Sequence, residues 1–335
     1  MSVSTQLWTE KYRPTTLDEV VGHEAAVERF EKFLDPEEGG GLPHVLLAGP
    51  PGVGKTAVIT AFARDLYGDS WRENFREFNA SDDRGIDVIR DDVKTWCRKA
   101  PADGAPYKIV FLDESDQLTR DAQPALRRIM EQYSDSTRFA LSCNYVNRII
   151  GPLQSRCATF HFGTLAEEDV AGLLDEIIET EGIDAEGPAV EKIARASRGQ
   201  ARDAVLTLQT ATTGGELTEE QVELVTGVVD DALVEEILTL ALDGEIDTAQ
   251  QRLDIEILKA GASPHALIDS VFRVLRKLDL PPDYRAKTFE LLAKTEERLQ
   301  MGLNPHVQFH ALLGHLYMAQ GLSPMAQQAG GGSGD

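Results

Sequence analysis

The amino-acid sequence predicts an α/β domain built on a parallel sheet, followed by helical domains. Between residues 42 and 162, short apolar runs alternate with helix-like segments, which is the pattern of a parallel sheet covered by helices on both faces. From Gly163 nearly to Gln320, apolar residues recur at helical spacing, and we expect no convincing strand there. A glycine-rich loop between the first apolar run and the next helix-like segment supports the same fold class.

The individual elements follow from the apolar runs and from helix-start signals. Thr164–Glu167 and Thr218–Gln221 are capping-box sequences, and each is expected to begin a helix. Strands are expected at 44–48, 107–112, 137–142 and 158–162, and helices at 57–66, 85–98 and 121–133. Breaks near Gly163 and Gly227 give expected domains over residues 1–162, 163–226 and 227–323, with a disordered Gly- and Ser-rich tail over 324–335.

Length and composition narrow the class of protein. The chain has 335 residues, enough for two or three domains, and no apolar run approaches the roughly 18 to 20 residues of a membrane span. The first ten residues lack the pattern of a signal peptide, so we expect a cytoplasmic protein with no membrane partner. Cys97, Cys143 and Cys157 form no C-x-x-C pair, so we expect reduced thiols and neither disulfides nor a zinc module.

The net charge of −23 is concentrated in the middle of the chain. Residues 161–260 hold 24 acidic and 6 basic side chains, against 25 and 20 in residues 1–160. One interpretation is a protein whose partner is not nucleic acid, because the negative field would repel it. The other is a halophilic source, since only 11 of the 33 basic residues are Lys. In molar salt the screening length falls to about 3 Å, so distant carboxylates would no longer repel an anionic partner.

The glycine-rich loop carries a complete G-x-x-x-x-G-K-T pattern. It consists of Gly49, Pro50, Pro51, Gly52, Val53, Gly54, Lys55 and Thr56. Such a loop turns backbone N–H groups around an anion, Lys55 adds a positive charge, and the Thr56 hydroxyl can bind Mg²⁺. The pattern therefore predicts a nucleotide-binding site for ATP or GTP.

Two further apolar runs end in polar residues. Residues 109–112 are followed by Asp113, which could hold Mg²⁺, and by Glu114, which could orient and deprotonate the attacking water. Adjacent carboxylates on a strand point to opposite faces, so the two could serve different roles. Asn144 follows the next run and could bind the water or the terminal phosphate, or it could simply be a turn residue. Parallel strands would bring these ends together at one sheet edge.

Two arginines, Arg156 and Arg202, are candidates to stabilise the charge that develops during phosphoryl transfer. An arginine placed there contributes about 10³ to 10⁵ in rate. Spacing alone leaves open that either one is a salt-bridge partner on an acidic surface.

Taken together, these residues resemble the AAA+ ATPases, and more closely the small subunits of replication factor C, the clamp loader of archaea and eukaryotes. The resemblance extends over nearly the whole chain, and its most specific pieces are residues 8–14 (WTEKYRP), 79–86 (NASDDRGI), 138–144 and 154–157 (QSRC). It implies a P-loop NTPase sheet domain, a helical lid and an all-α collar. It also implies ATP hydrolysis within a ring of small subunits and a large subunit, which opens a sliding clamp and loads it onto primer-template DNA.

The resemblance also implies a role for each matching residue. Tyr12, Arg13, Pro14, Val21 and Gly22 would lie near the adenine, Lys55 and Thr56 would hold phosphate and Mg²⁺, and Asp113 and Glu114 would be the Walker B pair. Asn144 would be the first sensor, Arg202 the second sensor, and Arg156 an arginine finger that reaches the ATP of a neighbouring subunit. The sequence departs from the family at Ser115 and at Gln200-Ala201, which indicates a divergent paralogue with an intact site.

DNA contacts are harder to predict from the sequence. Basic residues on two expected helices are candidates, namely Arg84, Arg90, Lys94, Arg120, Arg127 and Arg128. A solvated amphipathic helix would explain each of them equally well. Two alternative functions stay open, a ring subunit that binds ATP without hydrolysing it, and another AAA+ protein that processes DNA, such as a branch-migration helicase or an initiator.

Overall fold

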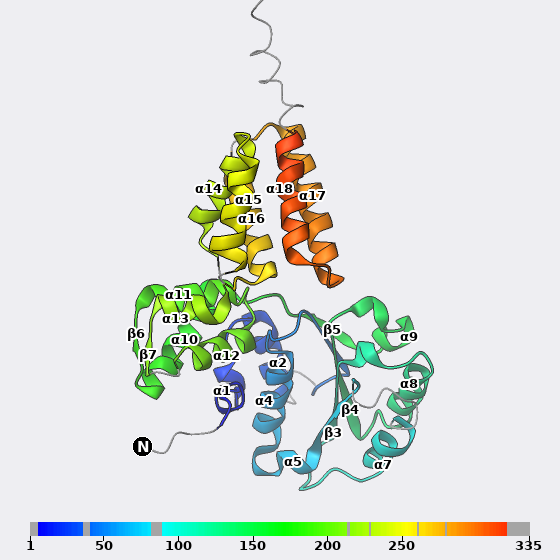
Figure 1. Ribbon diagram of the computed structural model, residues 1–335. Coiled ribbons are helices and arrows are strands. Elements are labelled where there is room, and N and C mark those ends of the chain that lie inside the picture. The colour runs from blue at the N-terminus through cyan, green and yellow to red at the C-terminus, as the bar shows by residue number, and fades with distance from the viewer. Residues whose placement is uncertain are drawn as a thin grey trace, which may run out of the picture. The chain divides into compact units, whose positions relative to one another are not determined.

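The computed structural model describes residues 6–35, 41–81, 89–212, 215–227, 229–259, 261–278 and 280–319 (Figure 1). The chain divides into two compact units, Met1–Leu217 and Thr218–Asp335. The sheet and the first helices after it belong to the first unit, so the expected boundary at Gly163 falls inside that unit. The proposed tail at 324–335 lies outside the described residues.

The centre of the first unit is a parallel sheet of five strands in the order β2-β3-β4-β1-β5. The strands are β1 (Val45–Ala48), β2 (Phe75–Asn79), β3 (Lys108–Asp113), β4 (Thr137–Cys143) and β5 (Ala158–His161). All four expected strands are confirmed within a residue or two, and β2 was missed. This edge strand is largely polar and only Phe75 in it is buried, so it lacks the apolar run that marked the others.

Helices cover both faces of the sheet, as the alternation of runs predicted (Figure 1). Val45 and Leu47 of β1 belong to one apolar core, whereas Leu46 and Ala48 belong to the other, because successive side chains of a strand point to opposite faces. The first face carries α2 (Glu24–Leu34), α4 (Lys55–Tyr67) and α5 (Trp71–Asn74), and the second carries α7 (Lys94–Cys97), α8 (Ala122–Gln132) and α9 (Gly151–Gln154). Short elements between them are α1 (Trp8–Lys11), η1 (Leu17–Glu19), η2 (Gly68–Ser70), η4 (Ser115–Gln117) and η5 (Val146–Arg148).

The helix expected over 85–98 is described only in part. Ile89–Val93 forms a π-helical turn, η3, that continues into α7, and both Ile89 and Val93 are fully buried. Residues 82–88 lie outside the described part of the chain, so the expected start of this helix is not described.

A group of lid helices completes the first unit. It contains α10 (Glu167–Glu181), α11 (Gly187–Ala196) and α12 (Ala201–Ala211), with the two-residue strands β6 (Asp184–Ala185) and β7 (Glu216–Leu217). The expectation of no strand after Phe162 is therefore wrong, because β6 and β7 pair in parallel, too briefly to leave an apolar alternation in the sequence.

The capping box expected at Thr164 is also wrong. The N-cap of α10 is Ala166, and no side chain caps the helix. Tertiary contact explains the difference, since the N–H of Leu165 donates to the carbonyl of Gly199 at 3.0 Å and Thr164 packs against the same glycine.

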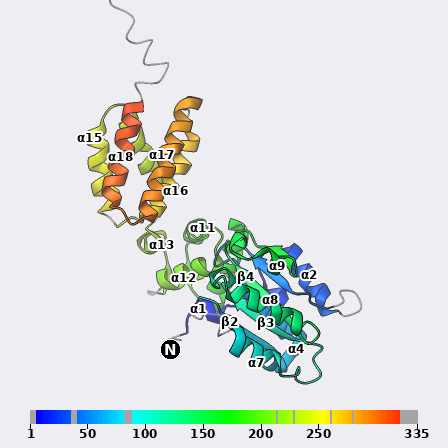
Figure 2. The same cartoon turned by 90° about the vertical axis from the view of Figure 1, so that its right-hand side faces the viewer.

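The described residues of the second unit form helices and the short segments that connect them. Its helices are α13 (Glu219–Thr226), α14 (Asp231–Leu242), α15 (Ile246–Arg252), the π-helical η6 (Leu253–Leu258), α16 (Pro264–Lys277), α17 (Pro282–Gln300) and α18 (Pro305–Ala319). The capping box at Thr218 is confirmed, because its side chain accepts from the N–H of Gln221 while the Gln221 side chain accepts from the N–H of Thr218. Helices α14 to α18 run alongside one another around one apolar core (Figures 1 and 2). No helix in the described ranges is both long and apolar enough to cross a bilayer.

Candidate functional site

The phosphate-binding loop joins β1 to α4, as its sequence predicted. Gly52 and Gly54 have φ of +74° and +98°, in the left-handed region that glycine enters without strain, and Gly54 is the N-cap of α4. Gly49 meets a different demand, because a Cβ there would lie 2.1 Å from the carbonyl oxygen of Phe162. The loop therefore packs directly on the chain that leaves β5, and the N-terminus of α4 is aimed at the site.

Lys55 lies at the start of α4 and is 7% exposed. Its ammonium donates to the carbonyls of Gly49 and Pro50 at 2.8 and 2.7 Å and to Oδ1 of Asn144 at 3.1 Å, which uses all three of its N–H groups. Burial lowers the pKa of Lys55, while the Asp113 carboxylate opposes that shift. Lys55 and Asn144, which are 89 residues apart, thus meet in one site, as the order of the motifs predicted.

Asp113 ends β3 opposite the loop. The Thr56 hydroxyl donates to Asp113 Oδ2 at 3.2 Å, and the Ser142 hydroxyl donates to Asp113 Oδ1. An octahedral Mg²⁺ holds oxygen ligands at about 2.1 Å, which separates neighbouring ligands by about 3 Å, so Thr56 and Asp113 fit such an ion together with phosphate oxygens and water. No set of three or more His, Cys, Asp or Glu side chains in the described ranges suits a metal ion, and Mg²⁺ bound mainly through phosphates does not need one.

Glu114 departs from the strand instead of continuing it. Its φ of +51° is rare for a residue other than glycine, and its N–H donates to Asp113 Oδ1 at 2.9 Å. The expectation that Asp113 and Glu114 point to opposite faces of one strand is therefore wrong, because β3 ends at Asp113 and Glu114 turns the chain into η4. Both residues nevertheless line one pocket with Asn144.

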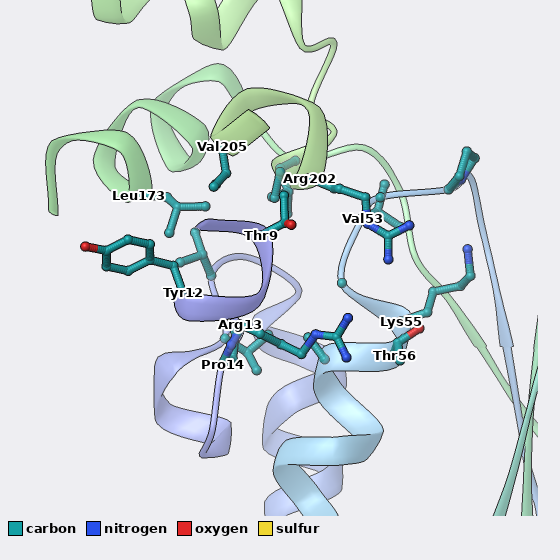
Figure 3. A pocket seen from close by; sticks show the side chains of 18 of the residues that line it. Thr9, Tyr12, Arg13, Pro14, Val53, Lys55, Thr56, Leu173, Arg202 and Val205 are labelled. Atoms are coloured by element: carbon teal, nitrogen blue, oxygen red, sulfur yellow. The ribbon is translucent and has the colours of Figure 1, made fainter. Parts of the chain in front are cut away.

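This pocket is bounded by three parts of the first unit, and Figure 3 shows it from close by. Its walls are the phosphate-binding loop with the ends of β3 and β4, the N-terminal residues around α1, and the lid helices. Of the predicted site residues, those lining it are Tyr12, Arg13, Pro14, Val21, Pro51, Gly52, Val53, Gly54, Lys55, Thr56, Asp113, Glu114, Asn144 and Arg202. Gly22, Gly49 and Pro50 do not line it. The carbonyls of Gly49 and Pro50 nevertheless accept hydrogen bonds from the Lys55 ammonium.

Three cationic side chains, Arg13, Lys55 and Arg202, line the pocket together with the carboxylates of Glu19, Asp113 and Glu114. Arg202, at the start of α12, is exposed, and its backbone N–H donates to the carbonyl of Gly52 at 3.4 Å, which joins the lid to the loop. Burial is the main cause of the lowered pKa of Lys55, and the positive charge of Arg202 lowers it further. In Figure 3, Arg202 extends from the lid and Arg13 from the N-terminal residues toward the start of α4. Cations that converge in this way favour a polyanionic ligand.

Arg156 is the one predicted catalytic residue that does not line the pocket. It follows α9, its guanidinium donates to the carbonyl of Pro152 at 2.8 Å, and it forms a salt bridge with Glu131 of α8. The same Glu131 oxygen accepts from Arg127 Nε at 3.1 Å. The side chain of Arg156 is 33% exposed, so it remains within reach of a neighbouring molecule.

The candidate DNA contacts that the structure describes, Lys94, Arg120, Arg127 and Arg128, do not line the pocket. Arg120 and Arg128 are exposed near and on α8, and Lys94 is half-buried in α7. Arg127 is occupied by its salt bridge to Glu131. Arg84 and the side chain of Arg90 lie outside what the structure describes.

Sequence reasoning missed several residues of the site. Trp8, Thr9, Leu173 and Val205 line the pocket but were not among the predicted site residues. Trp8 and Thr9 belong to the WTEKYRP motif and Val205 follows Arg202 by three residues, whereas nothing in the sequence pointed to Leu173. Asp116 is buried and does not line the pocket, but its Oδ1 accepts from the N–H of Asn144 at 3.3 Å and so helps to hold the backbone of Asn144 in place. Its position three residues after Asp113 was the available signal.

Comparisons with known proteins agree with this geometry. Residues 45–164 match the ATPase family associated with various cellular activities (AAA), and residues 229–315 match the replication factor C C-terminal domain. The chain is 43% identical over 312 residues to the replication factor C small subunit of Natronomonas pharaonis, covering 93% of this chain and 95% of the relative. It is 42% identical to that of Archaeoglobus fulgidus, covering 93% of this chain and 97% of the relative.

Among solved structures, the chain resembles the RuvB Holliday junction branch migration motor of Thermotoga maritima. The TM-score is 0.55, and the match covers 77% of this chain and 90% of that one. At 18% identity this likeness shows a shared fold and nothing about activity. Identity above 40% over almost the whole length decides the assignment. The chain belongs to the replication factor C small subunit family and is an AAA ATPase of the clamp loader that acts in DNA replication.

Proposed function

We propose that this chain binds ATP with Mg²⁺ in the pocket between the loop, the N-terminal residues and the lid, and that hydrolysis requires a second subunit. The observation that carries this proposal is the placement of the predicted groups. Lys55, Asp113, Glu114 and Asn144 line one pocket, whereas Arg156 lies outside it with its guanidinium partly exposed. Because Arg156 does not line the pocket of its own chain but is partly exposed, it could reach the pocket of a neighbouring chain. This placement supports an active site shared between two chains.

In this proposal each group has one task. Lys55 exchanges a carbonyl of the loop for phosphate oxygens, and Thr56 and Asp113 hold the Mg²⁺ that neutralises phosphate charge. Glu114 accepts a proton from the attacking water as the new bond to the γ-phosphorus forms and the bond from that phosphorus to the β–γ bridging oxygen breaks. Asn144 orients the water, and Arg202 and the neighbour's copy of Arg156 stabilise the charge on the γ-phosphoryl group.

The partners follow the family. We infer a ring of this chain with other small subunits and a large subunit, which opens a sliding clamp and places it around primer-template DNA in the cytoplasm. The exposed Arg120 and Arg128, with Arg84, Arg90, Lys94 and Arg127, stay candidates for backbone phosphate contacts. We also infer a halophilic archaeal source from the charge balance. Relatives from Natronomonas pharaonis and Halobacterium salinarum are 43% identical, but the relative from Methanococcus maripaludis is 44% identical, so these identities do not decide the source.

Of the two alternative functions, a non-hydrolysing ring subunit is less well supported, because Glu114 and Asn144 both line the pocket. Another DNA-processing AAA ATPase is less well supported because the likeness to a branch-migration motor is one of fold alone.

The proposal is tested with Arg156→Ala in two assays. We expect the isolated chain to bind ATP with unchanged affinity, because Arg156 does not line its own pocket. The complex with its large subunit, clamp and primed DNA should lose roughly 10³-fold or more of the turnover at this site. Arg195→Ala is the matched control, since Arg195 is exposed on α11 and its Nε lies 3.9 Å from Oε2 of Glu167, in an exposed ion pair.

Two results would contradict the shared site. One is full turnover by a complex that carries Arg156→Ala in every small subunit. The other is a monomeric preparation that hydrolyses ATP as fast as the assembled ring.

A further inference from the structure

The N-terminal strap, which we define as residues 6–17, connects the lid to the sheet side of the first unit. On the lid side, the Tyr12 hydroxyl and the Lys11 ammonium both donate to Oε1 of Glu181, each at 2.6 Å. At the other end, the N–H of Leu17 donates to Oδ2 of Asp65 in α4 at 2.8 Å. The strap is therefore hydrogen-bonded both to α10 of the lid and to the helix that follows the phosphate-binding loop.

A second attachment lies one turn earlier in the strap. The N–H of Trp8 donates to Oε1 of Gln209 in α12 at 3.0 Å, and Gln209 Nε2 donates back to the carbonyl of Gln6 at 3.3 Å. The rings of Trp8 and Tyr12 meet edge to face with centroids 6.2 Å apart, which joins the two attachments. Side chains from both long lid helices thus hold the same short helix, α1.

The strap is at the same time a wall of the nucleotide pocket. Trp8, Thr9, Tyr12, Arg13 and Pro14 line it, facing Leu173 and Val205 of the lid. Figure 3 shows α1 lying between the lid helices and the start of α4, with the Tyr12 hydroxyl directed away from Lys55. A change in how the lid holds the strap therefore changes the shape of the pocket.

Glu181 occupies the point where these contacts converge. It is the last residue of α10, its side chain is 22% exposed, and one of its oxygens serves two donors. Hydrogen bonds from Lys11 and Tyr12 hold the pKa of Glu181 below its usual range, so the carboxylate is ionised near neutral pH. A charged acceptor strengthens both hydrogen bonds relative to a neutral one.

We propose that Glu181 is a positioning residue, which anchors Tyr12 and the strap to the lid and thereby sets the affinity of the pocket for nucleotide. It does not touch the ligand. It acts through Tyr12, which lines the pocket while its hydroxyl is held by the lid. The inference rests on the nucleotide-binding role proposed above for this pocket, and it adds a residue that no nucleotide-binding motif contains.

The test measures binding of Mg²⁺–ATP to the full chain by calorimetry, with Glu181→Leu, Glu181→Gln and Tyr12→Phe. Glu181→Leu removes both hydrogen bonds, and we expect Kd to rise about tenfold. Glu181→Gln keeps an acceptor for Tyr12 and should restore much of the affinity. Adding Tyr12→Phe to Glu181→Leu should weaken binding little further, because the bond between the two side chains is already lost.

The assembled complex gives a second readout that separates positioning from mere folding. With Glu181→Leu in this chain, KM for ATP should rise about tenfold, whereas kcat at saturating ATP should stay within about twofold. Glu290→Gln serves as the matched control, since Glu290 forms exposed salt bridges with Lys287 and Lys294 within α17 of the other unit. That variant should leave Kd unchanged.

The outcomes distinguish this inference from the proposed function. If Lys55→Ala still binds ATP, the pocket assignment itself fails. If Lys55→Ala abolishes binding but Glu181→Leu binds like the unaltered chain, the pocket stands and the positioning role of Glu181 is overturned. A Glu181→Leu chain that unfolds at a lower temperature, yet binds ATP normally while folded, would also overturn it by showing a structural role only.

Discussion

Lowering the pH from 6.5 to 4 is expected to destabilise the first unit through a single imidazole, His44. This residue directly precedes β1, and its Nδ1 accepts from the N–H of Phe139 in β4 at 3.1 Å. Its own carbonyl accepts from the N–H of Ala158 in β5 at 2.8 Å. Burial, aided by the charge of Arg138, lowers the pKa of His44 from 6.5 to about 4.

The sign and the size follow from that pKa. Between pH 6.5 and 4 the unfolded chain takes up a proton at His44 that the folded chain does not, so the stability is fully present above pH 6.5 and is lost as the pH falls. The difference between a pKa of 6.5 and one of about 4 corresponds to about 3 kcal/mol of unfolding free energy. This value is an upper bound, because His44 is only half-buried and solvent weakens the effect.

The assay is urea unfolding followed by tryptophan fluorescence at several pH values and constant ionic strength. Trp8, Trp71 and Trp96 all lie in the first unit, so the signal reports on the unit that contains His44. His44→Asn can supply an acceptor to Phe139 without titrating, and between pH 6.5 and 4 it should lose less stability than the unaltered chain, by up to about 3 kcal/mol. Carboxylates titrate equally in both proteins. Identical pH dependence in the two would refute the argument.

Three further predictions concern the loop, the proposed catalytic carboxylate of Glu114 and the surface charge. Gly49→Ala places a Cβ 2.1 Å from the Phe162 oxygen, so it should cost about 2 to 3 kcal/mol in urea unfolding and weaken ATP binding; unchanged values in both assays would contradict the packing. Glu114→Gln should bind ATP within about twofold of normal while turnover of the complex falls by about 10² or more, and normal turnover would remove Glu114 from its role as base. With a net charge of −23, the thermal midpoint should rise between 0.1 and 2 M KCl, whereas a maximum in dilute buffer would count against the halophilic interpretation.

Much of the fold was predictable because its signals are local. Four of the five strands of the main sheet carry apolar runs, and the loop from Gly49 to Thr56 contains every residue type that its backbone and charge require. Thr218 and Gln221 cap a helix through contacts only three residues apart, so sequence spacing was sufficient. The edge strand β2 escaped because burial on one face was too slight to produce an apolar pattern.

Other features depended on contacts between distant parts of the chain. The capping box at Thr164 does not form, because Leu165 binds the backbone of Gly199 instead. Asp116 supports Asn144 from 28 residues away, and Glu181 holds Tyr12 from 169 residues away. No local pattern encodes such pairs, since a hydrogen bond over that separation exists only after the sheet and the lid have brought its partners together.

The sequence by itself determined which chemical groups serve the site, because a phosphate-binding loop and the polar ends of parallel strands are specified by residue type and spacing. Only the tertiary structure decided where those groups lie. It placed Lys55 against Asn144, left Arg156 outside its own pocket beside Glu131, and made the residues around Tyr12 a shared wall of pocket and lid. Side-chain positions depend on packing across the whole unit, which spacing along the chain does not record.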